Sequence, residues 1–354
     1  MAITLEDDPR RQKDEALFYE PLEENKVRCR LCGHECKIKP GRKGICGVRS
    51  NQGGMLVSLV YQRPVAEHID PIEKKPLYHF LPGTLAYSLG TAGCNFACVH
   101  CQNADISQAD PTARYLQGRE RTPLEIVQAA EDTGCYTVAH TYTEPTIFYE
   151  YSFDIARLAH ERGLKNAWVT NGYVMEKPAR AIAPYLDAAN VDLKAFSERV
   201  YMDLCRARLS KVMDTIVLFK KLGIWVEVTT LLIPDMNDDD KQLKGIAGFL
   251  AGVGPEIPWH VTRFYPTYKL TDRPPTPEKT LSRAWEIGKE AGLRYVYEGN
   301  VPGKGHENTS CYQCGETLIT RRGFSLVKNL VSKEGRCPKC NAPIDGVWTR
   351  DQTD

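Results

Sequence analysis

From residue 85 onwards, short apolar runs alternate with longer stretches in which apolar residues recur every three or four positions. The short runs are rich in β-branched and aromatic residues and predict strands, at 85–89, 136–140, 166–169, 189–193, 225–232 and 259–264. The longer stretches predict amphipathic helices, at 123–132, 150–161, 177–186, 212–222 and 239–250. A last helix over 277–291 and a strand over 293–297 complete the series. Several of these helices stop at a glycine, namely Gly134, Gly163, Gly223 and Gly252, as helix ends commonly do.

Six strand–helix units in series indicate an α/β fold with a parallel sheet wound right-handedly. We therefore expect a partial (β/α)6 barrel of the TIM type over residues 85–302. A Cys-rich N-terminal extension, 1–84, would precede it, with a metal-bound knuckle over 26–49, a strand over 55–65 and a Pro-punctuated connector over 70–83. Residues 303–354 are rich in Cys, Gly and Lys, and their few apolar residues predict a small domain held together by a metal.

Composition narrows the class of protein. Of 354 residues, 46 are basic and 45 acidic, and this near-neutral balance argues against a nucleic-acid-binding protein. The basic pair Arg321-Arg322 is expected on a solvated face. Residues 1–16 are charged and lack an apolar core, and the most apolar stretch, 215–234, is interrupted by charges. Neither an export signal nor a membrane span is therefore expected, and we predict a cytoplasmic protein.

The thirteen cysteines are the unusual feature of the composition. Two stand alone, Cys135 and Cys205, and are expected to be buried thiols. The other eleven form three tight groups: Cys29, Cys32, Cys36 and Cys46; Cys94, Cys98 and Cys101; and Cys311, Cys314, Cys337 and Cys340. Clustered cysteines in a chain expected in a reducing compartment are typical of metal sites rather than disulfides.

The group of three follows the first predicted strand, at the end of a barrel where active sites lie. Thiolates bind both zinc and iron–sulfur clusters. Three cysteines leave one iron of a [4Fe-4S] cluster open to a small molecule, whereas structural zinc requires a fourth ligand. His100 is adjacent to Cys101 and would strain a tetrahedral site. The count therefore favours a [4Fe-4S] cluster.

The spacing CX3CXXC after a first barrel strand resembles the signature of the radical S-adenosylmethionine (radical SAM) superfamily. The resemblance implies that S-adenosylmethionine binds the open iron and is cleaved reductively to a 5′-deoxyadenosyl radical, which abstracts a hydrogen atom from substrate. His100 stands where relatives carry an aromatic residue against the adenine, so the resemblance implies an adenine contact for its imidazole.

Further cofactor contacts are implied at the ends of the later strands. Glu144 corresponds to an acid that binds the cofactor's ammonium, Thr170 and Asn171 to polar groups near the ribose or methionine, and His260 to a histidine near the methionine end. Asp192 and Lys194 match a motif of glycyl-radical activases, and Arg263 would bind an anionic substrate group or the methionine carboxylate. Ordinary alternatives stay open: a loop acid, a rim ion pair and a structural histidine.

The two groups of four cysteines predict further metal sites. Cys311, Cys314, Cys337 and Cys340 have the spacing of a zinc ribbon, although a rubredoxin-type iron site uses the same ligands. Cys29, Cys32, Cys36 and Cys46 could hold zinc or a second [4Fe-4S] cluster, and their short polar segment slightly favours a zinc staple.

Most of the chain resembles the radical SAM proteins of the AmmeMemoRadiSam system, related to pyruvate formate-lyase-activating enzyme. The motifs are the two cysteine quartets, CX3CXXCQN and three short runs: 70–76 (DPIEKKP), 142–146 (YTEPT) and 263–266 (RFYP). The resemblance implies AMMECR-like and Memo-like partners and a flavodoxin- or ferredoxin-type reductant. We expect a radical enzyme acting on a small molecule or peptide. The alternatives are an activase of a glycyl radical enzyme and a zinc-ribbon nucleic-acid-binding protein. The sequence does not identify the substrate.

Overall fold

The computed structural model describes residues 14–108, 118–301, 303 and 306–349. Residues 1–13, on which the export-signal prediction largely rests, and the predicted domain boundary at residue 302 lie outside the described residues. Within the described ranges, every helix is too short or too polar to cross a lipid bilayer.

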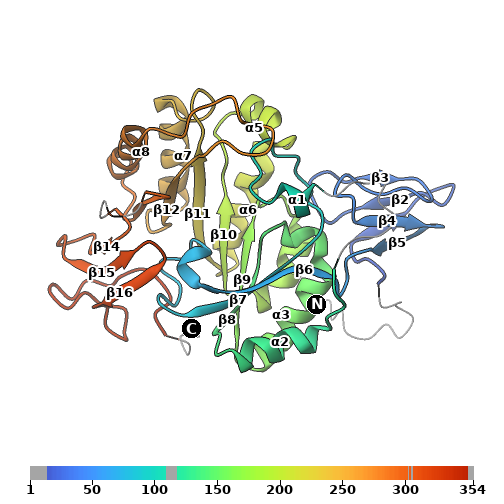
Figure 1. Ribbon diagram of the computed structural model, residues 1–354, viewed down its shortest axis with the longest axis horizontal. Coiled ribbons are helices and arrows are strands. Elements are labelled where there is room, and N and C mark those ends of the chain that lie inside the picture. The colour runs from blue at the N-terminus through green and yellow to red at the C-terminus, as the bar shows by residue number, and fades with distance from the viewer. Residues whose placement is uncertain (1–13, 109–117, 302, 304–305, 350–354) are drawn as a thin grey trace.

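An eight-stranded sheet forms the centre of the molecule (Figure 1). Seven of its strands are parallel and follow one another across the sheet in chain order. They are β7 (Leu85–Thr91), β8 (Thr137–His140), β9 (Lys165–Thr170), β10 (Ala188–Asp192), β11 (Trp225–Leu232), β12 (Trp259–Arg263) and β13 (Val296–Gly299). The eighth, β6 (Pro64–Pro71), pairs antiparallel with β7. The predicted α/β fold with a mostly parallel sheet is confirmed.

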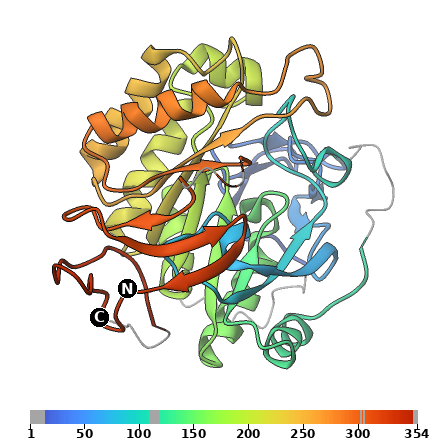
Figure 2. The same ribbon diagram turned by 60° about the vertical axis from the view of Figure 1, so that its left-hand side comes forward.

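Helices connect the successive parallel strands. The longer ones are α2 (Pro123–Asp132), α3 (Tyr149–Glu161), α6 (Leu209–Lys221), α7 (Asp240–Val253) and α8 (Glu278–Glu290). Shorter helices are α1 (Ala104–Ser107), α4 (Glu176–Ile182), α5 (Glu198–Cys205), η1 (Ile72–Lys74), η2 (Pro145–Phe148) and η3 (Ala183–Tyr185). Sequential strand order with right-handed crossovers puts the long helices on one face of the sheet, as Figures 1 and 2 show. The opposite, inner face is left for the connector and for a ligand.

Small side chains on the inner face make room for the connector that precedes β7. Ala86, Ala139, Ala167 and Ala188 come from four adjacent strands and pack against a cluster that includes Phe80. The connector's Ile72 and Leu77 belong to the same cluster, and each is fully buried. A segment expected only to link two regions therefore fills one end of the barrel.

Three of the four predicted helix-ending glycines lie just after their helices in the left-handed region, with φ of 68° at Gly134, 70° at Gly163 and 80° at Gly223. The prediction for Gly252 is wrong, because α7 continues to Val253. The N–H of the following Gly254 bonds to the carbonyl of Leu250 and ends the helix there.

Two small β-structured parts flank the barrel on opposite sides (Figure 1). The N-terminal part contains a sheet of β1 (Tyr19–Pro21), β2 (Val27–Cys29) and β3 (Lys37–Ile38), and a hairpin of β4 (Arg49–Gln52) and β5 (Met55–Ser58). The C-terminal part contains β14 (Thr309–Ser310), β15 (Thr317–Arg322) and β16 (Ser325–Asn329). The single strand predicted over 55–65 is wrong, because β5 ends at Ser58 and a turn precedes β6.

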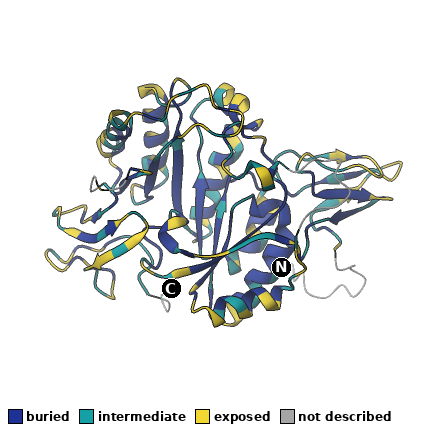
Figure 3. Ribbon diagram, in the orientation of Figure 1, coloured by how far each residue is buried: buried dark blue, intermediate teal, exposed yellow. Residues whose placement is uncertain are grey.

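The expectation that Arg321 lies on a solvated face is also wrong. Its side chain is fully buried, whereas Arg322 is exposed. Figure 3 shows that this C-terminal part contains both buried and exposed segments. The guanidinium lies 3.7 Å from the carboxylate of Glu73 and donates to the carbonyl of Tyr78 at 2.7 Å. Arg321 thereby joins the C-terminal sheet to the connector inside the barrel.

Candidate active site

A cavity of about 670 Å³ opens at the carboxyl ends of the parallel strands. Ten of the residues predicted to bind the cluster or the cofactor line it, from five different strand ends or loops: Cys94, Cys98, His100, Cys101, Glu144, Thr170, Asn171, Asp192, Lys194 and His260. Active sites of α/β barrels lie at this end of the sheet, because each strand delivers a side chain to the same opening.

The loop that carries the three cysteines is anchored to the end of α5. Backbone N–H groups of Ala97 and Val99 donate to the carbonyls of Cys205 and Leu204, each at 3.1 Å. These are the last residues of α5, so the loop packs against the C-terminal end of that helix. At the start of the loop, the N–H of Phe96 donates to Cys94 Sγ at 3.4 Å.

The three sulfurs suit a cluster better than a single ion. The C-terminal quartet is a compact group, in which all the ligand atoms lie within 4.8 Å of one another. Among the described residues, no other group of three or more potential metal ligands is as compact. The thiols of Cys94, Cys98 and Cys101 are therefore more widely spaced than ligands around one ion. Burial raises the pKa of the Cys94 thiol, so a metal is required to hold it as a thiolate.

Cys205 is a neighbour of this site that the sequence did not reveal. Its thiol, fully buried as expected, donates a hydrogen bond to Cys98 and lowers the pKa of Cys98. Its position at the end of α5 brings it there, and no spacing rule in the sequence connects residues 98 and 205. Cys135, the other lone cysteine, is buried in a second apolar cluster, as expected.

The ring of His100 is buried at the cavity wall. Burial, with the nearby charge of Lys194, lowers the pKa of His100 to about 3. The imidazole is therefore neutral at physiological pH, and its Nδ1 has no partner among the described residues. A neutral planar ring is suited to stacking on a base.

Glu144 is enclosed by donors of its own chain. Its Oε1 accepts from the hydroxyl of Thr146 at 2.5 Å and from that of Thr170 at 2.8 Å, and its Oε2 accepts from the N–H of Asn171 at 2.7 Å. Burial raises the pKa of this carboxyl group. Glu144 thus fixes the end of β9 while still lining the cavity.

Asn171 connects that strand end to the cysteine loop. Its Nδ2 donates to Oδ1 of Asn95 at 2.7 Å, and its Oδ1 accepts from the N–H of Tyr173 at 3.0 Å. On the next strand, Lys194 and Asp192 form an ion pair with 2.9 Å between Nζ and Oδ2. The rim pair considered from the sequence therefore exists, and both members face the cavity.

His260 belongs to a buried network centred on Glu227. The two side chains are joined by 2.7 Å between Nε2 and Oε2, and the carboxylate also accepts from the N–H groups of Tyr78 at 3.0 Å and His79 at 2.8 Å. Tyr297 stacks on the His260 ring with 5.2 Å between centroids. The sequence presented Glu227 only as a charge in an apolar run, and that isolated charge in a buried strand was the signal that could have found it.

Arg263 is the predicted residue that does not line the cavity. Its guanidinium lies 3.8 Å from Glu278 and over the ring of Tyr265, 5.2 Å from the centroid.

Lys75 is a cation that does line the cavity. It is buried and forms an ion pair with Asp70, with 2.6 Å between Nζ and Oδ2. The hydroxyl of Tyr142 donates to the same carboxylate at 2.6 Å.

The C-terminal quartet has the geometry of a single-ion site. Cys311 and Cys340 have 3.6 Å between sulfurs, Cys314 and Cys337 have 3.8 Å, and all four sulfurs lie within 4.8 Å of one another. Tetrahedral ligands with metal–sulfur bonds of ~2.3 Å are spaced at about 3.8 Å. This site can therefore bind a metal. The N-terminal quartet lines a separate cavity.

Comparison with known proteins places this arrangement in a class. Residues 88–244 match the model of the radical SAM superfamily, so the chain contains a domain of that superfamily, whose members are enzymes. A radical SAM domain implies a [4Fe-4S] cluster and S-adenosylmethionine.

The chain is 47% identical over 335 residues to "Uncharacterized protein MJ0808" of Methanocaldococcus jannaschii, covering 94% of this chain and 99% of the relative, and it belongs to the same family. It is 27% identical over 157 residues to GTP 3′,8-cyclase of Helicobacter pylori, covering 42% of this chain and 47% of the cyclase. A crystallised domain of pyruvate-formate lyase-activating enzyme from Bacteroides vulgatus is 21% identical with a TM-score of 0.40, covering 46% of this chain and 98% of that domain.

Proposed function

We propose that Cys94, Cys98 and Cys101 bind a [4Fe-4S] cluster and that S-adenosylmethionine occupies the adjoining cavity. The chain would then act as a radical enzyme that abstracts hydrogen from a small molecule or a peptide. The observation that carries this proposal is the cavity itself, in which the three thiols and seven further predicted residues face one opening. A bound cluster, reduced by an external one-electron donor, would supply the electron that cleaves the cofactor's C5′–S bond to methionine and a 5′-deoxyadenosyl radical.

The residues around the cavity have the charges that this cofactor requires. Glu144 supplies a carboxylate for the ammonium, Lys194 a cation for the carboxylate, and Thr170 and Asn171 polar groups for hydroxyls. His100 offers a neutral ring to the adenine. His260 is held by Glu227 at 2.7 Å, which fixes the orientation of its ring against the methionine end. Arg263, which faces Glu278 instead, has no part in this proposal.

Substrate would enter beside the cofactor, between the connector and the C-terminal part. That wall combines Lys74 and Lys75 with Glu298 and Glu307, and the ring of Phe324 stands at its edge. Both charge signs line the same wall, which suits a zwitterionic small molecule or a peptide backbone.

Several finer assignments belong to the same proposal. The chain would act in the cytoplasm, take electrons from a flavodoxin- or ferredoxin-type protein, and function within the AmmeMemoRadiSam system beside AMMECR-like and Memo-like proteins. The C-terminal quartet would hold zinc. The barrel would extend over about residues 85–302, between an N-terminal extension and a C-terminal ribbon, although β6 of that extension pairs with β7.

The test uses anaerobically reconstituted full-length protein with a strong reductant and deuterated candidate substrates. We expect label in 5′-deoxyadenosine from a small molecule or short peptide, and none in Cys94→Ala, Cys98→Ala or Cys101→Ala, which should also lose cluster iron. Label transfer only from the backbone glycine of a folded partner enzyme would favour the activase alternative. Full cluster content and cofactor cleavage in any of the three variants would refute the assignment.

A further inference from the structure

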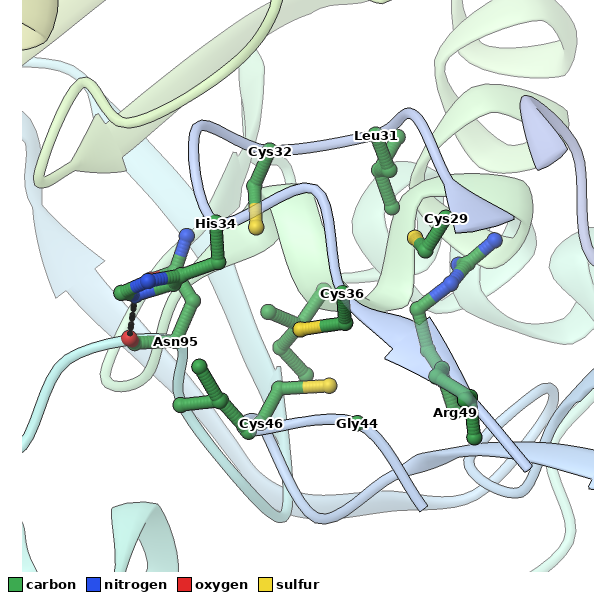
Figure 4. A pocket seen from close by; sticks show the side chains of 12 residues that line it. Cys29, Leu31, Cys32, His34, Cys36, Gly44, Cys46, Arg49 and Asn95 are labelled. Carbon is green, nitrogen blue, oxygen red and sulfur yellow. Dashed lines mark hydrogen bonds between the residues drawn. The ribbon is translucent and has the colours of Figure 1, made fainter. Parts of the chain in front are cut away.

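The N-terminal quartet surrounds a cavity of its own. Cys29 ends β2, Cys32 and Cys36 lie in the turn between β2 and β3, and Cys46 precedes β4. In Figure 4 the four sulfurs point into one common space from different sides. Four thiols brought together from three segments of the N-terminal part constitute a built ligand site rather than a set of scattered core residues.

The spacing of these sulfurs differs from that of the C-terminal quartet. At the C-terminal site, all four sulfurs lie within 4.8 Å, as ligands of one tetrahedral ion do. Across the described ranges, no other set of three or more potential ligand atoms is that compact. Any three sulfurs of the N-terminal quartet are therefore farther apart than those of the C-terminal quartet. A cubane distributes its four thiolates over four iron corners, and its ligands are therefore farther apart than those of one ion.

The lining of this cavity suits a buried anionic group. Leu31, Ile38 and Ile147 are buried apolar side chains of its lining. Arg49 also lines it and is 2% exposed, and its Nε has no partner among the described residues. The other guanidinium nitrogens bind Glu150 at 2.8 and 2.9 Å, so the free Nε is the part of this cation left for the site. A cluster with four thiolates carries net negative charge, which a buried guanidinium stabilises.

The quartet also lies directly against the loop that carries the three catalytic-site cysteines. His34 is not needed as a ligand, because its Nε2 bonds to the carbonyl of Asn95 at 2.7 Å. A Cβ on Gly93 would lie 2.7 Å from the carbonyl of Cys46, and the φ of Gly93 is 93°. Only glycine allows the two cysteine-bearing loops to approach so closely.

We propose that Cys29, Cys32, Cys36 and Cys46 bind a second [4Fe-4S] cluster, fully ligated by the protein. The zinc staple that the short polar segment favoured is the competing assignment. This inference is independent of which substrate the enzyme uses, and it concerns a site separate from the proposed cofactor cavity.

The experiment compares iron and acid-labile sulfide in anaerobically reconstituted full-length variants. The triple variant Cys94→Ala/Cys98→Ala/Cys101→Ala should retain about four irons and four sulfides per chain, with the Mössbauer spectrum of a cubane. Adding Cys36→Ala, or in a separate chain Cys46→Ser, should remove that sulfide. Sulfide is the decisive quantity, because a rubredoxin-type iron at the C-terminal quartet contains none. Cys135→Ala, a buried cysteine outside all three groups, is the matched control and should change neither content.

A triple variant that contains zinc and no sulfide would overturn the proposal. So would sulfide that persists when Cys36→Ala and Cys46→Ser are each added. Failure of the proposed function has a different signature: wild type and triple variant would then have equal sulfide, and the Cys36→Ala single variant would have none.

Discussion

Glu144 illustrates how one side chain can serve both architecture and ligand binding. Each of its carboxylate oxygens accepts from the chain, yet the residue lines the cavity. The Glu144→Gln variant keeps the size of the side chain but replaces one acceptor by an amide. We expect S-adenosylmethionine to bind ten- to a hundredfold more weakly, about 1.5–3 kcal/mol for a charge-assisted hydrogen bond. Titration of the cofactor, followed by the cluster's EPR signal, measures this, with iron content unchanged.

The control for that variant is Glu290→Gln, which alters an exposed acid on α8. It should bind the cofactor as wild type does. Equal affinities for Glu144→Gln and Glu290→Gln would show that Glu144 only shapes the end of β9.

The lowered pKa of His79 makes the stability of the fold depend on pH. Burial lowers its pKa to about 4, with Glu227 opposing and Arg321 and His260 adding to this effect. Between pH 6.5 and 4 the unfolded chain binds a proton that the folded chain does not, so stability is full above pH 6.5 and is lost as the pH falls towards 4. The loss approaches about 3 kcal/mol for this one group.

Denaturant unfolding of wild type and His79→Gln at several values between pH 7.5 and 5 tests this. As the pH falls over this range, the free energy of unfolding should decrease less steeply for the variant than for wild type. The difference in slope should reach at most the contribution of one bound proton. Identical slopes would show that His79 titrates normally. The ring also bonds to the carbonyl of Asp345 at 2.6 Å, and the variant loses this bond at every pH. The stability of the variant at each pH is therefore referred to its own stability at neutral pH.

Among the elements, β7 is the one whose position decides where the cysteine loop begins. A Cβ on Gly90 would lie 2.5 Å from the carbonyl of Thr141, just after β8. Gly90→Ala should therefore push the two chain segments apart, destabilise the fold by about 1–3 kcal/mol and reduce cluster content.

Gly248→Ala is the matched control, because a Cβ there meets nothing within 4 Å and the residue is inside α7. It should be stabilising by about 0.5–1 kcal/mol. Thermal unfolding and iron analysis of both variants make the comparison. If Gly90→Ala unfolds and binds iron as wild type does, the contact with Thr141 is not restrictive.

The long elements were predictable because their signal is local. Helix α2 was expected with its exact bounds, and the parallel strands within a few residues, since periodicity and buried apolar runs are read within one window. Strand β6 was missed because it is partly exposed and begins and ends with proline, as edge strands can. Helix α5 was not among the helices expected from the sequence, because its eight residues give little pattern.

The cavity residues were predictable in part. Glu144 and Lys194 were expected from the resemblance to the radical SAM superfamily, together with their places at strand ends. Glu227, Cys205 and Asp70 reach the site or its network through contacts between distant segments, which no spacing in the chain encodes.

Across the whole molecule, the C-terminal part closes the cavity that the barrel opens. Glu307, Gly323 and Phe324 line its wall. The contacts of Arg321 with Glu73 and Tyr78 fix that part to the connector. Asp345, near the end of the described chain, accepts from Arg294 of the barrel with both carboxylate oxygens at 2.8 Å. The cysteine quartet is the remaining support, because this short segment buries few apolar side chains of its own.

Cys337→Ala should therefore act on the cavity from a distance. Removing one of four thiolates releases the metal and loosens the wall, while the loop with Cys94, Cys98 and Cys101 is untouched. We expect loss of one bound metal per chain, unchanged cluster iron, and about tenfold weaker binding of S-adenosylmethionine, equivalent to ~1.4 kcal/mol. Metal analysis and cofactor titration on the full chain give the three quantities. Lys339→Ala removes an exposed ion pair with Glu316 on the same part and should alter none of them. Unchanged cofactor affinity after complete metal loss would mean that the C-terminal part contributes no closure to the site.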